Sequence, residues 1–142
     1  AVDLGHDGLV VPVVHHADLG GDVDGMWDPD APESIWLDRT LNQAARRSVL
    51  THELVHRERG DAACCTPWHE RHQERLVDDA AARRLIPLPK LVDALLWSID
   101  PVEVAEILWV DGATLRARLA NLTGAEHGAI EERLWAAEGR MP

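Results

Sequence analysis

The stretch SVLTHELVHRERG, residues 48–60, constrains this chain most, because it places two histidines and a glutamate within five residues of an amphipathic segment. His52 and His56 are four residues apart, so on a helix they lie one turn apart on the same face. Two imidazoles at that spacing can both bind one Zn²⁺ at about 2.0–2.1 Å. Glu53 points to the same side and can take a proton from a water that the metal activates. The pattern predicts His52 and His56 as zinc ligands and Glu53 as the catalytic base; the alternative is a solvated face that needs no metal.

A catalytic zinc also needs a third protein ligand and an open fourth position. The next predicted helix offers candidates, and Glu74 is favoured because Asp78 follows it by one turn on the same face. In this arrangement Glu74 binds the metal, and Asp78 accepts the free N–H of a ligand histidine and so orients the ring. His72 is the rival third ligand, because sites with three histidines exist.

Three short segments near the start of the chain predict a small sheet. Residues 9–16 are β-branched and apolar, and residues 26–28 and 34–39 flank a proline-rich turn. Alternating or continuous apolar segments bounded by turn residues are typical of strands, so we expect about three strands in an antiparallel sheet. The strand around residues 35–38 could bind an extended substrate as an additional strand, or be an ordinary sheet edge.

Capping signals predict where the two central helices begin and end. Thr40 is the expected N-cap of the first, in the capping box TLNQ, and Gly60 is a natural residue to end it. Thr66 is the expected cap of the second, which Pro87 should stop. The apolar residues of the first helix that we expect to face a core are Leu41, Ala44, Ala45, Val49, Leu50, Leu54 and Val55.

The C-terminal third predicts further helices, with the capping boxes DPVE at 100–103 and TGAE at 123–126. Residues 102–122 have helix-turn-helix spacing, in which Arg116 and Arg118 should be exposed. A DNA-reading helix needs a basic face, but the surroundings here are acidic, so packing or recognition of a regulator is the better interpretation.

The six tryptophans and the absence of tyrosine and phenylalanine make the aromatic composition unusual. Trp97, Trp109 and Trp135 are expected to be core or lid residues, because no basic groove surrounds them as in a base-stacking platform.

The composition excludes several classes of function. The net charge of −11 disfavours direct nucleic-acid binding. No apolar run approaches membrane-spanning length, and no signal segment opens the chain. The adjacent cysteines Cys64 and Cys65 do not make a disulfide framework, so we interpret them as reduced thiols. These features predict a cytoplasmic protein without a membrane partner.

The segments IWLDRTLNQAARRSVLTHELVHRERGD and WHERHQERLVDDAAARRLIP together resemble the ImmA/IrrE-type metallopeptidases, over about residues 10–90. The resemblance implies a gluzincin-like zinc peptidase of bacterial or phage regulation that cleaves a transcriptional repressor or a related regulator. It implies His52, His56 and Glu74 as ligands and Glu53 as the base. Where the family helix usually has a Phe-Ala pair, this chain has Ala80-Ala81, so packing there must differ.

The expected fold is therefore α+β: a small antiparallel sheet packed on a zincin-like helical core, followed by an all-helical C-terminal third. A chain of 142 residues is the size of one domain. We expect a single domain over 1–142, with a metallopeptidase-like core at 9–90 and a helical extension at 91–142.

One part of a peptidase site has no obvious provider in the sequence. The oxyanion of the transition state usually has a second donor besides the metal, and the chain has no tyrosine. His69, Arg71 and His72 on the second helix, and His15 or His16 on the first strand, are the candidates. The alternative function is a non-catalytic, metal-stabilised module that binds a protein partner, such as an antitoxin or a regulator component.

Overall fold

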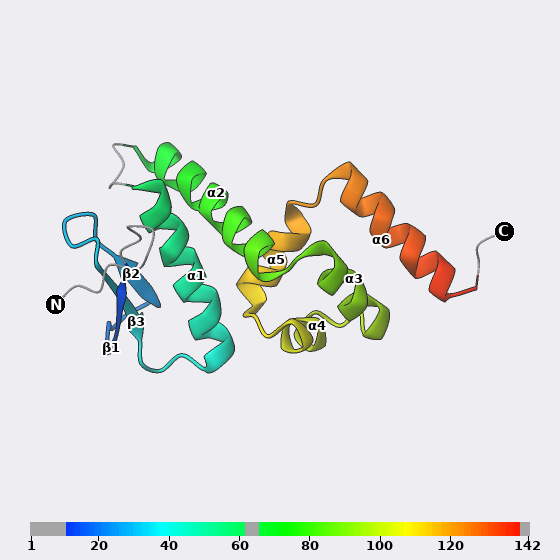
Figure 1. Cartoon of the computed structure of the whole chain (residues 1–142), viewed down its shortest axis with the longest axis horizontal. Helices are drawn as coiled ribbons and strands as arrows, with labels where there is room; N and C mark the ends of the chain where they lie inside the picture. The colour runs from blue at the N-terminus through cyan, green and yellow to red at the C-terminus, as the bar shows by residue number, and fades with distance from the viewer. Residues whose placement is uncertain (1–10, 62–65, 140–142) are drawn as a thin grey trace. The chain divides into compact units, whose positions relative to one another are not determined.

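Within residues 11–61 and 66–139, which the computed structural model describes, the chain forms three strands followed by six helices (Figure 1). The α+β class expected from the sequence is confirmed. The chain divides into two compact units, 1–74 and 75–142, so the division falls inside the second helix rather than at residue 90. The single domain expected over 1–142 stays a prediction, and each unit is described by itself.

The sheet of the first unit has the order β1-β3-β2, with β1 at Val13–Ala17, β2 at Gly25–Trp27 and β3 at Ser34–Asp38. The pair β2–β3 is antiparallel, but β1 and β3 are parallel, so the expectation of a wholly antiparallel sheet is wrong. The physical reason is that β1 is not a neighbour of β2: the chain leaves β1, passes to the far side of β3 and returns through a hairpin. Neighbours in sequence are thus not always neighbours in the sheet.

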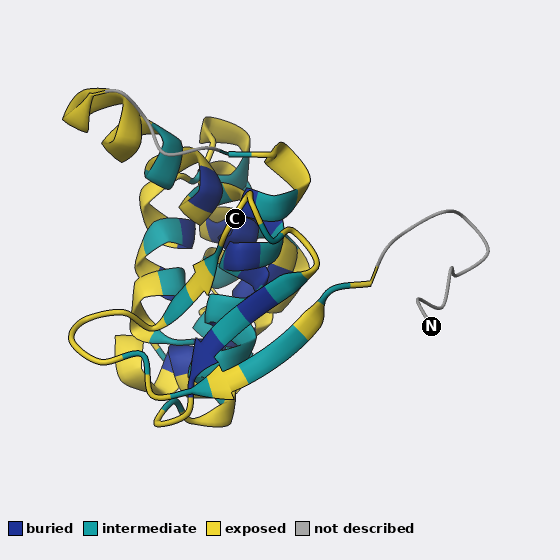
Figure 2. Ribbon diagram, turned by 90° about the vertical axis from the view of Figure 1, so that its left-hand side faces the viewer, coloured by how far each residue is buried: buried dark blue, intermediate teal, exposed yellow. Residues whose placement is uncertain are grey.

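Strand β3 is the centre of this sheet, and Figure 2 shows the buried positions that it carries. Ile35 and Leu37 are almost fully buried, whereas no residue of β1 is buried. Because β3 is hydrogen-bonded to a strand on each side, it has no free edge to accept a substrate strand. That expectation is wrong, and the two edges are β1 and β2.

Helix α1, Gln43–Arg59, begins two residues later than the sequence predicts. Its N-cap is Asn42, whose side chain accepts a hydrogen bond from the backbone N–H of Ala45. Thr40 is instead part of the turn that leaves β3, where its hydroxyl and backbone N–H both donate to the carboxylate of Asp38. The predicted end is confirmed: Gly60 has a left-handed conformation with φ 68°, which glycine adopts without a steric cost.

The buried face of α1 is largely polar. Of the apolar positions expected to face a core, only Val55 is buried and the others are half-buried. The remaining buried residues of this helix are Ser48, Thr51, Glu53 and His56. Polar groups are buried only where they find hydrogen-bond or ionic partners, so this face marks a place where side chains interact specifically.

Helix α2, Pro67–Leu85, starts where the sequence predicts. The hydroxyl of Thr66 accepts a hydrogen bond from the backbone N–H of His69, which is the contact of a capping residue. The helix ends just before Pro87. Cys64 and Cys65 lie outside the described residues.

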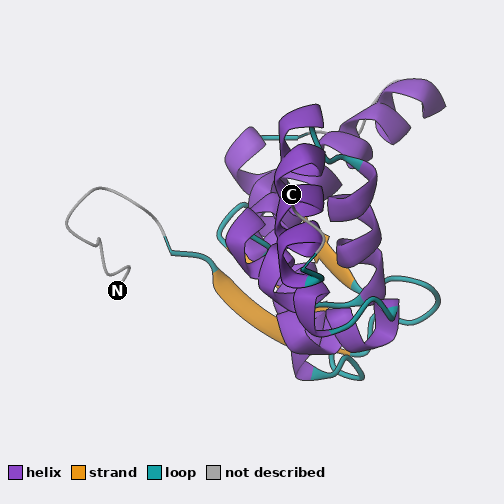
Figure 3. Ribbon diagram, turned by 90° about the vertical axis from the view of Figure 1, so that its right-hand side faces the viewer, coloured by secondary structure: helices purple, strands orange, loops and turns teal. Residues whose placement is uncertain are grey.

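The second unit contains α3 (Leu88–Trp97), α4 (Pro101–Leu108), α5 (Gly112–Ala120) and α6 (Gly124–Ala137), the helices that Figure 3 draws in purple. Asp100 and Thr123 cap α4 and α6 as predicted. The largest members of the buried core of this unit are Leu85, Ile86, Leu91, Leu115 and Ile130. Among the described residues, no helix is both long and apolar enough to cross a membrane.

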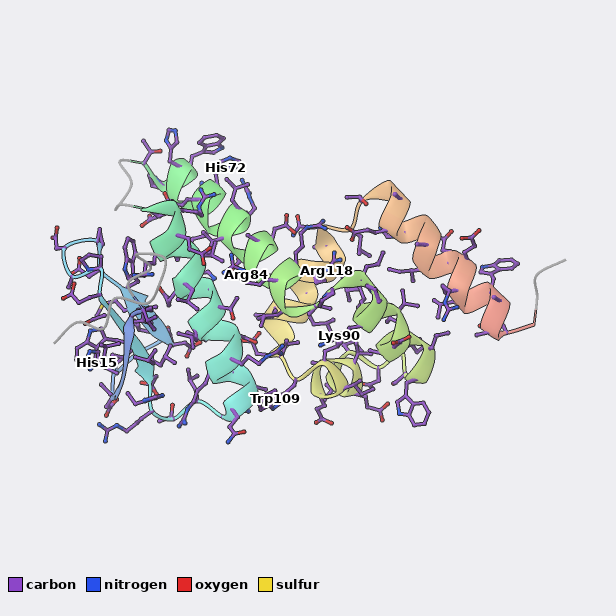
Figure 4. The ribbon with its side chains drawn as sticks, viewed as in Figure 1. His15, His72, Arg84, Lys90, Trp109 and Arg118 are labelled. Carbon is purple, nitrogen blue, oxygen red and sulfur yellow. The ribbon has the colours of Figure 1, made fainter. Side chains whose placement is uncertain are left out.

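Two expectations about the second unit are wrong. Arg118 is 3% exposed rather than on the surface: its Nε donates to the carbonyl oxygen of Ile86, and its Nη1 donates to Glu126 (Figure 4). It follows the buried Leu115 by three residues, so both lie on the inward face of α5. Conversely, Trp97, Trp109 and Trp135, expected to be core or lid residues, are exposed, so their placement in a core is wrong and a lid role stays a prediction.

Candidate metal centre

Three side chains of the first unit, from two helices, converge on one point. His52 and His56 come from successive turns of α1, and Glu74 comes from α2. The two Nε2 atoms of the histidines lie 3.1 Å apart. The Glu74 carboxylate reaches both rings, with Oε2 3.2 Å from Nε2 of His52 and Oε1 3.0 Å from Nε2 of His56. The structure therefore brings together the three residues that the sequence predicts as ligands.

The spacing and chemistry of this group fit a metal ion. One ligand atom of each residue lies within 4.8 Å of the others, so the group could hold a metal ion. In a tetrahedral site with bonds of about 2.0–2.1 Å, neighbouring ligand atoms are about 3.3 Å apart, close to the distances between these atoms. Two imidazole nitrogens and a carboxylate oxygen are also ligands that zinc binds readily.

The electrostatics of the group favour a charged Glu74. Hydrogen bonds from His52 and His56 hold the pKa of the Glu74 carboxyl far below its usual range, against the opposing effect of partial burial. Burial lowers the pKa of His56, but its hydrogen bonds to Glu74 and Asp61 outweigh that effect, and its pKa lies above the usual value. An ionised carboxylate between two imidazoles is already in the form that a metal ligand requires.

Asp61 holds the far side of the His56 ring, a role that sequence reasoning assigned to Asp78. Oδ2 of Asp61 lies 2.9 Å from Nδ1 of His56, and the Asp61 side chain is only 10% exposed. The guanidinium of Arg59 donates its Nε–H to the same carboxylate at 3.0 Å. When the His56 ring is neutral, an aspartate that accepts the Nδ1–H leaves the lone pair on Nε2, the atom that faces the metal position.

Backbone geometry explains how Asp61 reaches that place. The left-handed turn at Gly60 ends α1 and brings the chain back, so that the Asp61 N–H donates to the carbonyl oxygen of His56. The signal available in the sequence was an aspartate directly after the glycine that ends the helix. Asp78 is an exposed residue of α2, and the contact expected for it stays a prediction.

Glu53, the expected base, is 8% exposed and lies on the side of α1 that packs against strand β2. Burial raises the pKa of its carboxyl, against the lowering effects of His52 and His56 and of a hydrogen bond from the backbone N–H of Trp27. A raised pKa suits a group that must accept a proton and then release it near neutral pH.

Gly25 of β2 allows this close approach of strand and helix. A Cβ atom at this position would lie 3.2 Å from Oε1 of Glu53 and 2.4 Å from Cγ1 of Val49. The second distance is shorter than real Cβ atoms show. Any residue larger than glycine would require the Val49 side chain or the backbone of β2 to shift. Nothing in the local sequence pattern indicates this contact between Gly25 and the expected base.

The residues considered as oxyanion donors are exposed, as His16 is on β1, or contact other side chains. His72 stacks on Trp68, with centroids 5.3 Å apart, and Nδ1 of His69 lies 2.7 Å from the hydroxyl of Thr66. Arg71 is exposed as well. On the sheet, His15 stacks on Trp36 (His15 and His72 are labelled in Figure 4). None of these belongs to the converging group, and a donor role for them stays a prediction.

Comparison of the chain with protein-family models, with curated proteins and with solved structures gives no match. A function for this chain therefore has to be inferred from the geometry of the site itself. That geometry combines a three-residue group able to hold a metal with a buried carboxylate of raised pKa next to it.

Proposed function

We propose that this protein is a zinc-dependent metallopeptidase of the ImmA/IrrE type, which hydrolyses a peptide bond in a protein regulator. The observation that carries the proposal is the convergence of His52, His56 and Glu74 beside the buried Glu53. A structural zinc site is usually closed by four protein ligands, whereas a catalytic one has three and an open position. Three ligands together with a carboxylate that does not bind the metal favour catalysis.

Each residue of the group has a defined part in the proposed reaction. Zn²⁺, when bound, supplies Lewis acidity and lowers the pKa of water to about 7. Glu53 takes the proton of the attacking water and delivers it to the leaving nitrogen as the peptide bond breaks. Asp61 keeps the His56 ring in the orientation and tautomer that present Nε2.

The proposed substrate rests on the sequence resemblance, and the proposed compartment rests on the reading of the two cysteines as reduced thiols. A transcriptional repressor or a related regulator is the proposed substrate, and the cytoplasm is the proposed location. The charge of −11 makes direct binding of nucleic acid unfavourable. The burial of Arg118 removes one of the two arginines that a DNA-reading α5 would present.

The alternative function is a non-catalytic module in which the metal only stabilises the fold. The described residues place no oxyanion donor beside the metal group, which favours this alternative: the chain has no tyrosine, and His69 and His72 contact other side chains. Both functions require the metal site, but only the peptidase hydrolyses a peptide bond.

The decisive experiment compares the wild-type protein with the Glu53→Gln variant, both loaded with zinc. Each is incubated with candidate regulators encoded by neighbouring genes and with an unfolded protein such as casein, and the cleavage products are analysed by mass spectrometry. Peptidase function predicts the same zinc content in both proteins and cleavage by the wild type alone. Equal cleavage by both would remove Glu53 from the mechanism, and cleavage by neither would favour the binding module.

A further inference from the structure

The junction of α3 and α4 presents three large apolar side chains to solvent. Trp97 and Ile99 are each 84% exposed, and Val102 is 68% exposed. These values are high for residues in or next to helices of a packed unit, and the three residues lie within a six-residue stretch. Contiguous exposed apolar residues on a folded unit mark sites of interaction more often than isolated ones do.

Local hydrogen bonds hold this stretch in one shape. The hydroxyl of Ser98 donates to Oε2 of Glu103 at 2.5 Å and accepts from the backbone N–H of Asp100 at 3.1 Å. The carboxylate of Asp100 in turn caps α4. A preformed surface loses little conformational entropy when a partner binds, which favours binding.

Carboxylates share the helix faces of two of these apolar side chains. Asp93 precedes Trp97 by one turn of α3, and Glu106 follows Val102 by one turn of α4, so each pair shares a helix face. Glu103 lies in the first turn of α4. Across residues 88–108 there are four carboxylates and a single cation, Lys90. The apolar centre therefore has a predominantly acidic border.

We propose that Trp97, Ile99 and Val102 form a docking surface for a cationic amphipathic segment of a partner protein. A tryptophan at the centre of such a surface supplies a large area for contact, and the acidic border pairs with lysine or arginine on the segment. The acidic border also disfavours other occupants. A symmetric contact with a second copy would bring like charges together, and residues 1–10 of this chain carry two aspartates and no lysine or arginine.

The surface belongs to the second unit, and its function does not depend on the metal centre. Binding should therefore be the same in the presence of a chelator, so a failure of the proposed peptidase function and a failure of this inference give different results.

The test uses a fluorescein-labelled helical peptide of leucine and lysine as the probe, with binding to the full chain followed by fluorescence anisotropy. Trp97→Ser should weaken binding at least tenfold, whereas Trp135→Ser, which removes another exposed tryptophan on α6, should leave it unchanged. Asp93→Lys and Glu106→Lys should each weaken binding several-fold, and Glu131→Lys, the same charge change on α6, should have a much smaller effect. Circular dichroism melting establishes that each variant is folded.

Three results would overturn the proposal. One is equal binding of the peptide to the wild type and to Trp97→Ser, which would indicate attraction by overall charge alone. Another is equal binding of a peptide in which glutamate replaces lysine. The third is Trp97-dependent self-association of the chain in sedimentation, which would assign the surface to a second copy.

Discussion

Nδ1 of His56 lies 2.9 Å from Oδ2 of Asp61, a residue that follows the helix of the histidine rather than belonging to it. The left-handed conformation of Gly60 turns the chain back at the end of α1, so that Asp61 contacts His56 in the last turn of that helix. It makes the orientation of one expected ligand depend on a carboxylate five residues along the chain. The first prediction concerns this carboxylate.

Asp61→Ala should weaken zinc binding by about 10- to 100-fold, because the His56 ring loses the acceptor that fixes its tautomer. Asp61→Asn should have a smaller effect, since its amide oxygen can still accept the Nδ1–H. Competition with a chromophoric chelator measures the affinity. Asp22→Asn, on an exposed loop, is the matched control and should bind zinc as the wild type does. Unchanged affinity in Asp61→Ala would show that His56 is oriented by something else.

Gly25→Ala should destabilise the protein by about 1–3 kcal/mol, because its Cβ would lie 2.4 Å from Cγ1 of Val49 and require the Val49 side chain or the backbone of β2 to shift. The free energy of unfolding is measured in urea. In the double variant with Val49→Ala, the clashing methyl group is absent, so the cost of Gly25→Ala should be smaller than in the wild-type background. Gly128→Ala is the control: nothing lies within 4 Å of that Cβ, and alanine in a helix should be neutral or stabilising.

Glu126→Gln should destabilise the second unit, because it removes the carboxylate that neutralises the buried Arg118. Removing one partner of a buried ion pair costs about 3–5 kcal/mol, and the 16% exposure of Glu126 places the effect at the lower end. Glu131→Gln, an exposed change on the same helix, should have little effect.

The same glutamate predicts a dependence on pH. Hydrogen bonds from Arg83 and Arg118 hold the pKa of Glu126 below its usual value. A lowered pKa in the folded state contributes stability that is fully present above about pH 4.3 and is lost as the pH falls through the folded-state pKa. The free energy of unfolding of Glu126→Gln should therefore fall less steeply below pH 4.3 than that of the wild type. Parallel curves for the two proteins would place the acid sensitivity elsewhere.

Local sequence rules predicted the ligand residues, whose positions depend on helix spacing. They missed the contacts that depend on turns and on packing between elements. The placement of His52 and His56 follows from one helical turn, and Glu74 followed from the need for a third ligand on the next helix. Asp61 and Gly25 act through a left-handed turn and through strand–helix contact, and neither has a periodic pattern. Arg118 was misplaced because an arginine on a short helix is usually exposed, and its partner Glu126 lies on the next helix.

The choice between Glu74 and His72 as third ligand can be made by stabilisation with zinc. A metal that binds only the folded state stabilises it by about 2.7 kcal/mol when its free concentration is 100 times Kd. The wild type should therefore melt at a higher temperature with zinc, and His52→Ala and Glu74→Ala should lose both this shift and the bound metal. His72→Ala should retain both, because that ring stacks on Trp68 while the Glu74 carboxylate reaches both histidines. Elemental analysis gives the zinc content of each variant. Loss of zinc in His72→Ala with retention in Glu74→Ala would exchange the two assignments and require α2 to turn its other face to the histidines.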